Sequence, residues 1–119
     1  MSNTRKDTGK KGENIAADYL AAQNFSILER NWRYKHCEVD IIASKDNCLH
    51  FIEVKTRRND HFGYPEESIG REKMTALKKA AEAYLYRNTQ WKNIQFDAIS
   101  IILEGETVKE ILWIDDVYF

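Results

Sequence analysis

Two acidic residues and a lysine stand on either side of a short polar segment of the chain. Asp40 comes first, and Glu53 and Lys55 follow thirteen and fifteen residues later. Carboxylate oxygens are the ligands that Mg²⁺ prefers, and a bound Mg²⁺ can polarise a phosphoryl oxygen and acidify a water molecule. A lysine beside such an ion can neutralise the charge that develops during the reaction. These residue types therefore indicate a metal-dependent site for phosphate chemistry.

The segments around these residues predict how their side chains meet. Residues 38–44 and 48–56 are rich in Val and Ile and predict two strands, with a tight turn at 46–47. In an antiparallel hairpin with this turn, Asp40 lies directly opposite Glu53. Opposed Cβ atoms are about 4.5–5.5 Å apart, and like charges at that distance destabilise a sheet. A divalent cation, Mg²⁺ or Mn²⁺, between the two carboxylates would remove this conflict.

Two further acids belong to the same region. The hairpin register places Glu38 opposite Lys55, and either an ion pair with Lys55 or a ligand role is open for Glu38. We favour the ion pair. Residues 12–23 predict a helix, with Glu13 in its first turn at the edge of the apolar face, where a carboxylate gains from the helix dipole. From there Glu13 can lean over the sheet edge and complete the acidic cluster.

The rest of the chain supplies the elements that must position these side chains. The other predicted elements are strands at 26–34, 94–103 and 107–114 and a helix at 71–86. This helix is long enough to be a crossover, which would make the third and fourth strands parallel. The order predicts an α/β fold, with a mixed sheet of about five strands flanked by helices. We expect one domain over residues 1–119, with residues 1–10 flexible.

The composition argues against several classes of protein. The chain has 119 residues, of which 43% are hydrophobic, enough to bury a core. It contains no long apolar run, so we expect no membrane span. The polar, basic N-terminus lacks the apolar segment of a secretory signal. Cys37 and Cys48 lack Cys-x-x-Cys spacing, so neither a disulfide framework nor a zinc site is indicated. We expect a cytoplasmic protein.

Charge is unevenly distributed along the chain. Residues 1–96 contain 17 Lys and Arg against 13 Asp and Glu, whereas residues 97–119 contain one Lys against six acids. Binding to phosphate depends on where charge lies, so the net charge of −1 does not argue against DNA. Exposed basic residues are often only solvated, and that interpretation stays open beside a role in DNA binding. The candidates for phosphate contacts are Arg30, Arg33, Arg57 and Lys73.

Motifs along nearly the whole chain carry a resemblance to a known family. They are Gly12-Glu13, Arg30-Asn31-Trp32-Arg33, Glu38-Val39-Asp40-Ile41-Ile42-Ala43, Phe51-Ile52-Glu53-Val54-Lys55-Thr56-Arg57, Lys73, Ala81, Tyr84-Leu85 and Phe96-Asp97. With them the chain resembles the YraN-like group of uncharacterised bacterial proteins. One departure is Cys37, where that group usually has a glycine. A glycine there would permit an unusual backbone conformation, but the change removes no proposed ligand.

The YraN-like group is similar to the PD-(D/E)-x-K nucleases, and especially to archaeal Holliday junction resolvases. The resemblance implies a restriction-endonuclease-like fold and a Mg²⁺- or Mn²⁺-dependent endonuclease that cuts DNA, such as branched DNA. It implies that Asp40 and Glu53 are metal ligands, that Lys55 is the catalytic lysine, and that Glu13 is an accessory acid.

Two other functions remain open. The chain could be a non-catalytic nucleic-acid-binding module, or a protein-interaction module in DNA processing. The presence of Asp40, Glu53 and Lys55 together favours the nuclease over a binding module, while the acidic C-terminal segment suits a partner face. A small domain covers little duplex, and cutting both strands needs two sites, so a homodimer is a further expectation.

Overall fold

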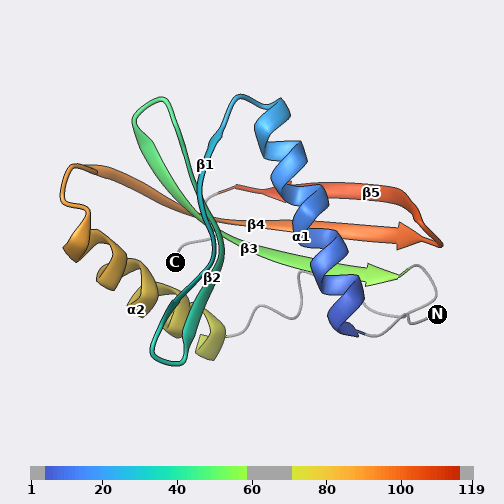
Figure 1. The fold of residues 1–119 in the computed structure, drawn as a ribbon, viewed down its shortest axis with the longest axis horizontal. Coiled ribbons are helices and arrows are strands. Elements are labelled where there is room, and N and C mark those ends of the chain that lie inside the picture. Colours follow the sequence, from blue (N-terminus) through green and yellow to red (C-terminus); the bar gives the residue numbers. More distant parts are fainter. Residues whose placement is uncertain (1–4, 59–70, 116–119) are drawn as a thin grey trace.

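The computed structural model describes residues 5–58 and 71–115. The elements are α1 (Arg5–Ala22), β1 (Ser26–Tyr34), β2 (Cys37–Lys45), β3 (Cys48–Arg58), α2 (Arg71–Arg87), β4 (Asn93–Glu104) and β5 (Thr107–Ile114). The strands form one sheet in the order in which they occur along the chain (Figure 1). The predicted α/β fold, a mixed five-stranded sheet flanked by helices, is confirmed.

The connections between the strands explain the mixture of directions. Three neighbouring pairs, β1 with β2, β2 with β3, and β4 with β5, are antiparallel. The central pair of β3 and β4 is parallel, and α2 is the connection between them. Parallel neighbours need such a crossover because the chain must return to the same end of the sheet. The predicted parallel pair is therefore confirmed.

The β2–β3 hairpin has the predicted register. Its ladder runs from Ile41 opposite Ile52 to Lys45 opposite Cys48, which leaves a two-residue turn. The turn residues, Asp46 and Asn47, have φ angles of 51° and 64°. A two-residue hairpin turn of this type needs positive φ at both positions, and Asp and Asn tolerate that conformation better than most residues. The turn therefore sets which side chains meet farther along the strands.

The first helix is longer than its apolar spacing predicts. It begins at Arg5, so residues 5–10 are helical, although we expected flexible chain there. Thr8 is buried, and its Oγ1 accepts a hydrogen bond of 3.2 Å from Nε of Arg58 at the end of β3. A tertiary contact thus stabilises a polar turn whose sequence carries no apolar helical signal. Neither α1 nor α2, the two described helices, is long and apolar enough to cross a membrane.

The two faces of the sheet carry separate hydrophobic clusters because successive residues of a strand point to opposite sides. On β3, Phe51 packs with the buried residues of α2, whereas Ile52 packs with those of α1. Each large side chain buried in this way contributes about 1.5–3 kcal/mol. The buried residues of α2 recur at the predicted helical spacing, and they are Met74, Leu77, Ala80, Ala81 and Tyr84.

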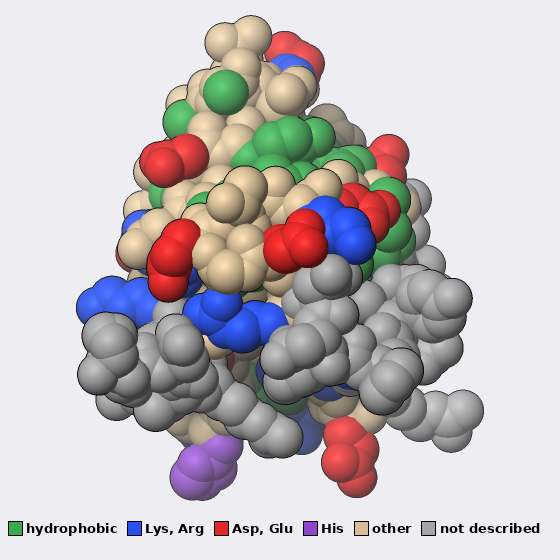
Figure 2. All heavy atoms as spheres, turned by 90° about the vertical axis from the view of Figure 1, so that its right-hand side faces the viewer, with side chains coloured by type: hydrophobic (Ala, Val, Ile, Leu, Met, Phe, Trp, Pro, Cys, Tyr) green, Lys and Arg blue, Asp and Glu red, His purple; other side chains and the backbone are tan. Residues whose placement is uncertain are grey.

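Charges of both signs are interleaved on the side of the molecule where β3 and β4 end (Figure 2). One example is the ion pair between Lys11 of α1 and Glu106 in the turn after β4. Among the described residues visible in this view, acidic side chains interrupt the basic ones. The described part of this side is therefore not a continuous basic surface.

Candidate functional site

Strands β2 and β3 separate at the point where the two predicted metal ligands stand. The last paired residues are Ile41 and Ile52, one pair before Asp40 and Glu53. Beyond that pair, Oδ2 of Asp40 accepts a hydrogen bond of 2.8 Å from the backbone N–H of Val54. The carboxylate thus satisfies an N–H that lies past the end of the ladder. This contact fixes Asp40 against β3.

The surroundings of both acids disfavour negative charge. Burial raises the pKa of Asp40 to about 7, and the nearby charges of Glu53 and Glu13 add to the rise, although the Val54 N–H opposes it. Burial also raises the pKa of Glu53, whose side chain is only 5% exposed. Glu53 is thus close enough for its charge to raise the pKa of Asp40, and both residues follow directly after the last pair of the β2–β3 ladder. A cation placed between them would stabilise both carboxylates.

A lysine from α2 reaches this acidic pair. Nζ of Lys73 lies 3.0 Å from Oε2 of Glu53, which is the distance of a charge-assisted hydrogen bond. Burial pulls the pKa of Lys73 down, but attraction to Glu53 and Asp40 outweighs it, so the pKa is raised overall. Lys73 lies in the first turn of α2. The crossover helix therefore contributes a positive charge to a cluster built on the hairpin.

Lys55 lies on the same strand as Glu53, two residues farther along. The two side chains point to the same face of β3, and Lys55 opposes the rise in the pKa of Glu53. Directly beside Lys55 in the parallel register is Ser100 of β4. Within the described structure, Oγ of Ser100 is buried and has no hydrogen-bond partner. This face of the sheet thus carries an acid, a lysine and an unsatisfied hydroxyl side by side.

Glu13 reaches the cluster because α1 lies unusually close to β3. A Cβ atom added to Gly12 would stand 1.8 Å from Oγ1 of Thr56, so only a glycine permits this approach. Glu13 follows directly and lies 4.0 Å from the guanidinium of Arg30. The same guanidinium donates a 2.8 Å hydrogen bond to Oδ1 of Asn14. The charge of Glu13 adds to the rise in the pKa of Asp40, and Glu13 also has a basic partner of its own in Arg30.

The basic residues predicted to contact DNA have protein partners as well. Arg30 is paired with Glu13, and Lys73 with Glu53. Arg33 lies 3.7 Å from Glu38. The fourth candidate, Arg57, is half-buried at the end of β3 and also has an interaction within the protein.

The ion pair of Glu38 differs from the one that we favoured. Its partner is Arg33 on β1, directly opposite in the β1–β2 register, and not Lys55. The reason is the separation of β2 from β3. The ladder between these strands ends before Glu38 and Lys55 could face each other. Register alone predicts cross-strand partners only where the strands remain paired.

The donor set suits Mg²⁺ better than an ion that needs a complete protein cage. Within the described ranges, no three His, Cys, Asp or Glu side chains converge into a ready-made metal site. Asp40 and Glu53 offer two carboxylates just beyond the last pair of the β2–β3 ladder. Mg²⁺ is commonly held by one or two carboxylates, with water and substrate phosphate as its other ligands. The residues present therefore fit a magnesium ion that binds together with a phosphate.

Comparison with known proteins places the chain in a family. The model of "Uncharacterised protein family UPF0102" matches residues 12–101. The chain belongs to this family. The matched span contains Glu13, Asp40, Glu53, Lys55 and Lys73. The resemblance to the YraN-like uncharacterised group is thereby confirmed.

Relatives named UPF0102 protein match most of the chain. One from Dictyoglomus thermophilum is 50% identical over 99 residues, which cover 82% of this chain and 84% of the relative. One from Flavobacterium johnsoniae is 44% identical over 105 residues, or 85% of each chain. One from Chloroherpeton thalassium is 37% identical over 124 aligned positions, covering 98% and 96%.

The UPF0102 chain also contains a buried acid–base pair that the sequence did not lead us to predict. Nδ1 of His50 lies 2.6 Å from Oδ2 of Asp97, which is fully buried. Both residues interrupt apolar runs on neighbouring strands, Leu49-His50-Phe51 and Phe96-Asp97-Ala98. A single polar residue inside an apolar strand is the signal that could have revealed them, because a buried polar group needs a partner.

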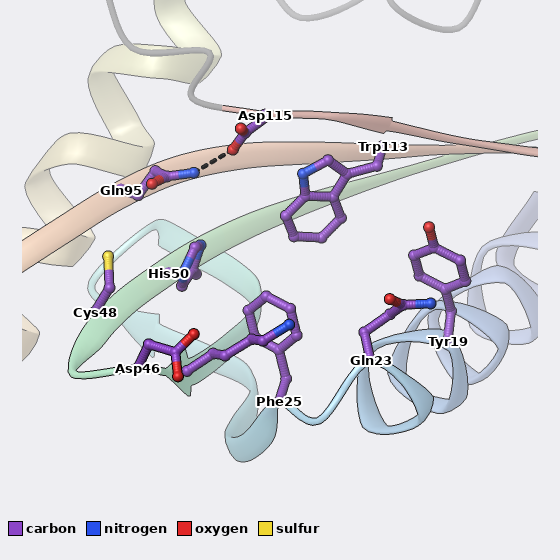
Figure 3. Close-up of a pocket in the computed structure, with 10 residues that line it drawn as sticks. Tyr19, Gln23, Phe25, Asp46, Cys48, His50, Gln95, Trp113 and Asp115 are labelled. Atoms are coloured by element: carbon purple, nitrogen blue, oxygen red, sulfur yellow. Dashed lines mark hydrogen bonds between the residues drawn. The ribbon is translucent and has the colours of Figure 1, made fainter.

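His50 and Asp97 belong to a region separate from the acidic cluster. His50 lines a pocket of about 480 Å³ beside Phe25 and Trp113, with Tyr19 and Gln23 of α1 on its far side (Figure 3). His50 and Glu53 point to opposite faces of β3 because their positions differ by an odd number. Charged residues of both signs, Lys45, Asp46 and Asp115, also line this pocket.

Proposed function

We propose that this UPF0102 chain is a metal-dependent endonuclease that hydrolyses phosphodiester bonds in DNA, including branched DNA. One observation carries the proposal. Asp40 and Glu53 come together where β2 leaves β3, and Lys55 lies on the same strand face as Glu53. Two carboxylates can hold Mg²⁺ beside a phosphate, and a nearby lysine can stabilise the charge that develops during phosphodiester hydrolysis. A mixed five-stranded sheet flanked by helices is also the architecture expected from the PD-(D/E)-x-K resemblance.

Each residue of the cluster has a distinct part in this proposal. Asp40 and Glu53 would hold Mg²⁺ or Mn²⁺, which when bound supplies Lewis acidity to the phosphate and acidity to a water ligand. Lys55 orients the attacking water or neutralises negative charge as it develops. Glu13 provides a third carboxylate near Asp40 and can accept a hydrogen bond from water at the edge of the cluster. It therefore has an accessory role.

A cleavage assay with variants tests the proposal. The substrates are duplex, single-stranded, flap and four-way-junction DNA, each with Mg²⁺ or Mn²⁺. We expect cutting of at least one substrate, and a loss of about 100-fold or more in Asp40→Asn, Glu53→Gln and Lys55→Ala. Lys79→Ala, on the exposed surface of α2, is the matched control and should cut like the unmodified protein. If no substrate is cut in a metal-dependent way, or if Asp40→Asn cuts as fast as the unmodified protein, the proposed nuclease activity is refuted.

A non-catalytic role has one observation in its favour. Three of the four candidate DNA contacts, Arg30, Arg33 and Lys73, are paired with acids of the protein, which suits a module that binds another protein. Titration of binding against salt separates the alternatives. A nucleic-acid binder loses affinity as salt rises, because phosphate contacts release counterions. A protein-interaction module should show no affinity for DNA at low salt.

A further inference from the structure

Lys73 already neutralises a carboxylate that the proposed metal would need. Its ammonium lies 3.0 Å from Oε2 of Glu53, and the two side chains differ greatly in exposure, 49% for Lys73 and 5% for Glu53. Glu53 is buried on a central strand, whereas Lys73 has a long, flexible stem that is half in solvent. One partner of this ion pair is fixed, and the other is free to change its position.

A divalent cation and an ammonium compete for the same buried oxygen atoms. Asp40 also attracts Lys73, so both proposed metal ligands act on this lysine. A cation bound by Asp40 and Glu53 would take over their charge and repel the ammonium. The ion pair between Lys73 and Glu53 would then lose its driving force, and the flexible side chain of Lys73 could turn toward solvent.

The first turn of α2 is a favourable place for an anion to meet Lys73. The N–H groups at a helix N-terminus and its dipole attract negative charge. Lys73 lies in that turn, beside the acids that would hold a phosphate-bound metal. A change of side-chain rotamer could therefore bring its ammonium to a phosphate bound beside Asp40 and Glu53. Lys55, by contrast, lies on β3, the same strand as Glu53.

We propose that Lys73 has two successive partners, Glu53 in the metal-free protein and a non-bridging oxygen of the substrate phosphate once a divalent cation occupies the cluster. This inference rests on the proposed function. Under this inference Lys73, from the crossover helix α2, is a second catalytic lysine beside Lys55. In the metal-free protein its ammonium takes the place of the metal as the positive charge beside Glu53. A purely structural ion pair would instead remain in place when metal and DNA bind.

Metal binding without DNA provides the first test. Mn²⁺ binding is measured by the EPR signal of the free ion at pH 8.5, where Asp40 is ionised and Lys73 remains charged. We expect Lys73→Met to bind Mn²⁺ about tenfold more tightly, because a competing charge-assisted hydrogen bond is gone. Lys79→Met makes the same charge change on an exposed part of α2 and should leave the affinity unchanged. Lys73→Arg keeps the competing charge and should resemble the unmodified protein.

DNA binding provides the second test. Anisotropy of a fluorescein-labelled four-way junction is followed in Ca²⁺ buffer at several salt concentrations. Lys73→Met should bind about tenfold more weakly, and its slope of log K against log salt should fall by about 0.9, the value for one lost phosphate contact. Lys79→Met is again the control, and Lys73→Arg should retain binding. Circular dichroism shows whether each variant is folded, and Lys73→Arg keeps the charge that balances Glu53.

The outcomes separate this role from the nuclease itself. Tighter Mn²⁺ binding together with weaker DNA binding in Lys73→Met supports both partners of Lys73. Equal or weaker Mn²⁺ binding overturns the competition with metal, and an unchanged salt slope overturns the phosphate contact. Unmodified protein that binds neither Mn²⁺ nor the junction overturns the proposed function. Protein that binds both, with Lys73→Met behaving like Lys79→Met, overturns only the inference about Lys73.

Discussion

Asp40 is the residue at which stability and proposed function conflict. Its pKa of about 7, raised chiefly by burial and then by Glu53, makes its ionisation costly near neutral pH. The hydrogen bond from the Val54 N–H and the charge of Lys73 favour the ionised carboxylate, but they do not offset the effects of burial and of the neighbouring acids. A carboxylate that is costly in the metal-free protein is well prepared for a cation, since binding then relieves the conflict.

This conflict predicts how stability depends on pH in the absence of metal. Between pH of about 4 and 7 the folded protein keeps a proton on Asp40 that the unfolded chain has lost, so stability falls as pH rises through this window. Asp40→Asn should remove this part of the dependence of stability on pH and be more stable than the unmodified protein at pH 8, by about 4 kcal/mol at most. The asparagine oxygen can still accept the hydrogen bond from Val54.

Urea unfolding with EDTA at pH 5 and pH 8 measures the effect. The difference between variant and unmodified protein should favour Asp40→Asn at pH 8 and be clearly smaller at pH 5, where only about a third of the effect has developed. Burial also raises the pKa of Glu53, so the stability of Asp40→Asn should still fall with rising pH, but less steeply than that of the unmodified protein. A variant that loses stability equally at both pH values would show that Asp40 is not destabilising when ionised.

Side-chain partners were harder to predict than the residues themselves. Asp40 and Glu53 could be found because a two-residue turn and the period of a strand together specify a register. The contact of Lys73 with Glu53 could not, because it depends on where α2 docks and no local pattern encodes that position. The predicted partner of Glu38 was wrong for a related reason, because nothing in the strand sequences shows where β2 separates from β3.

At the scale of elements, the approach of α1 to β3 decides where Glu13 lies. Gly12→Ala would force a Cβ atom into Thr56, with contacts of 1.8 Å to Oγ1 and 2.8 Å to Cβ. Thr is branched at Cβ and has little freedom to withdraw, so α1 must shift. We expect a loss of about 1–3 kcal/mol in the free energy of unfolding. Cleavage should also fall, because the shift moves Glu13 away from Asp40.

Gly9 provides a control within the same helix. A Cβ atom added at Gly9 meets nothing within 4 Å. Gly9→Ala should therefore stabilise the protein by about 0.5–1 kcal/mol through helix propensity alone. Chemical denaturation of both variants measures whether Gly12→Ala lowers and Gly9→Ala raises the free energy of unfolding. If Gly12→Ala were as stabilising as Gly9→Ala, the close approach of α1 to β3 would not matter for stability.

The elements themselves were largely predictable, with one instructive exception. Strands and α2 follow from period-two and helical spacing of apolar residues, because each buries one face against the other layer. The start of α1 was missed because its first turns are polar. Their support comes from the Arg58–Thr8 hydrogen bond and the Lys11–Glu106 ion pair, both between parts of the chain far apart in sequence.

At the scale of the whole molecule, the described structure contains one acid–lysine cluster of the proposed type. If the proposed function holds, a single cluster would cut one strand at a time, and concerted cutting of two strands would need two chains. We therefore expect a homodimer on a four-way junction, with one cluster for each of two opposed strands. This expectation can be tested by mixing unmodified protein with Asp40→Asn, because a mixed dimer would contain one working site.

In an equal mixture, random pairing would make about half of the dimers mixed. Such dimers should cut one strand of the junction, so singly cut product should increase relative to doubly cut product when Asp40→Asn is added. Independent monomers give a different result, since the inactive chains only dilute the active ones or compete for DNA. Light scattering of the protein–junction complex measures the number of chains directly. A mass that corresponds to one chain per junction would contradict the dimer while leaving the single-strand chemistry of the cluster intact.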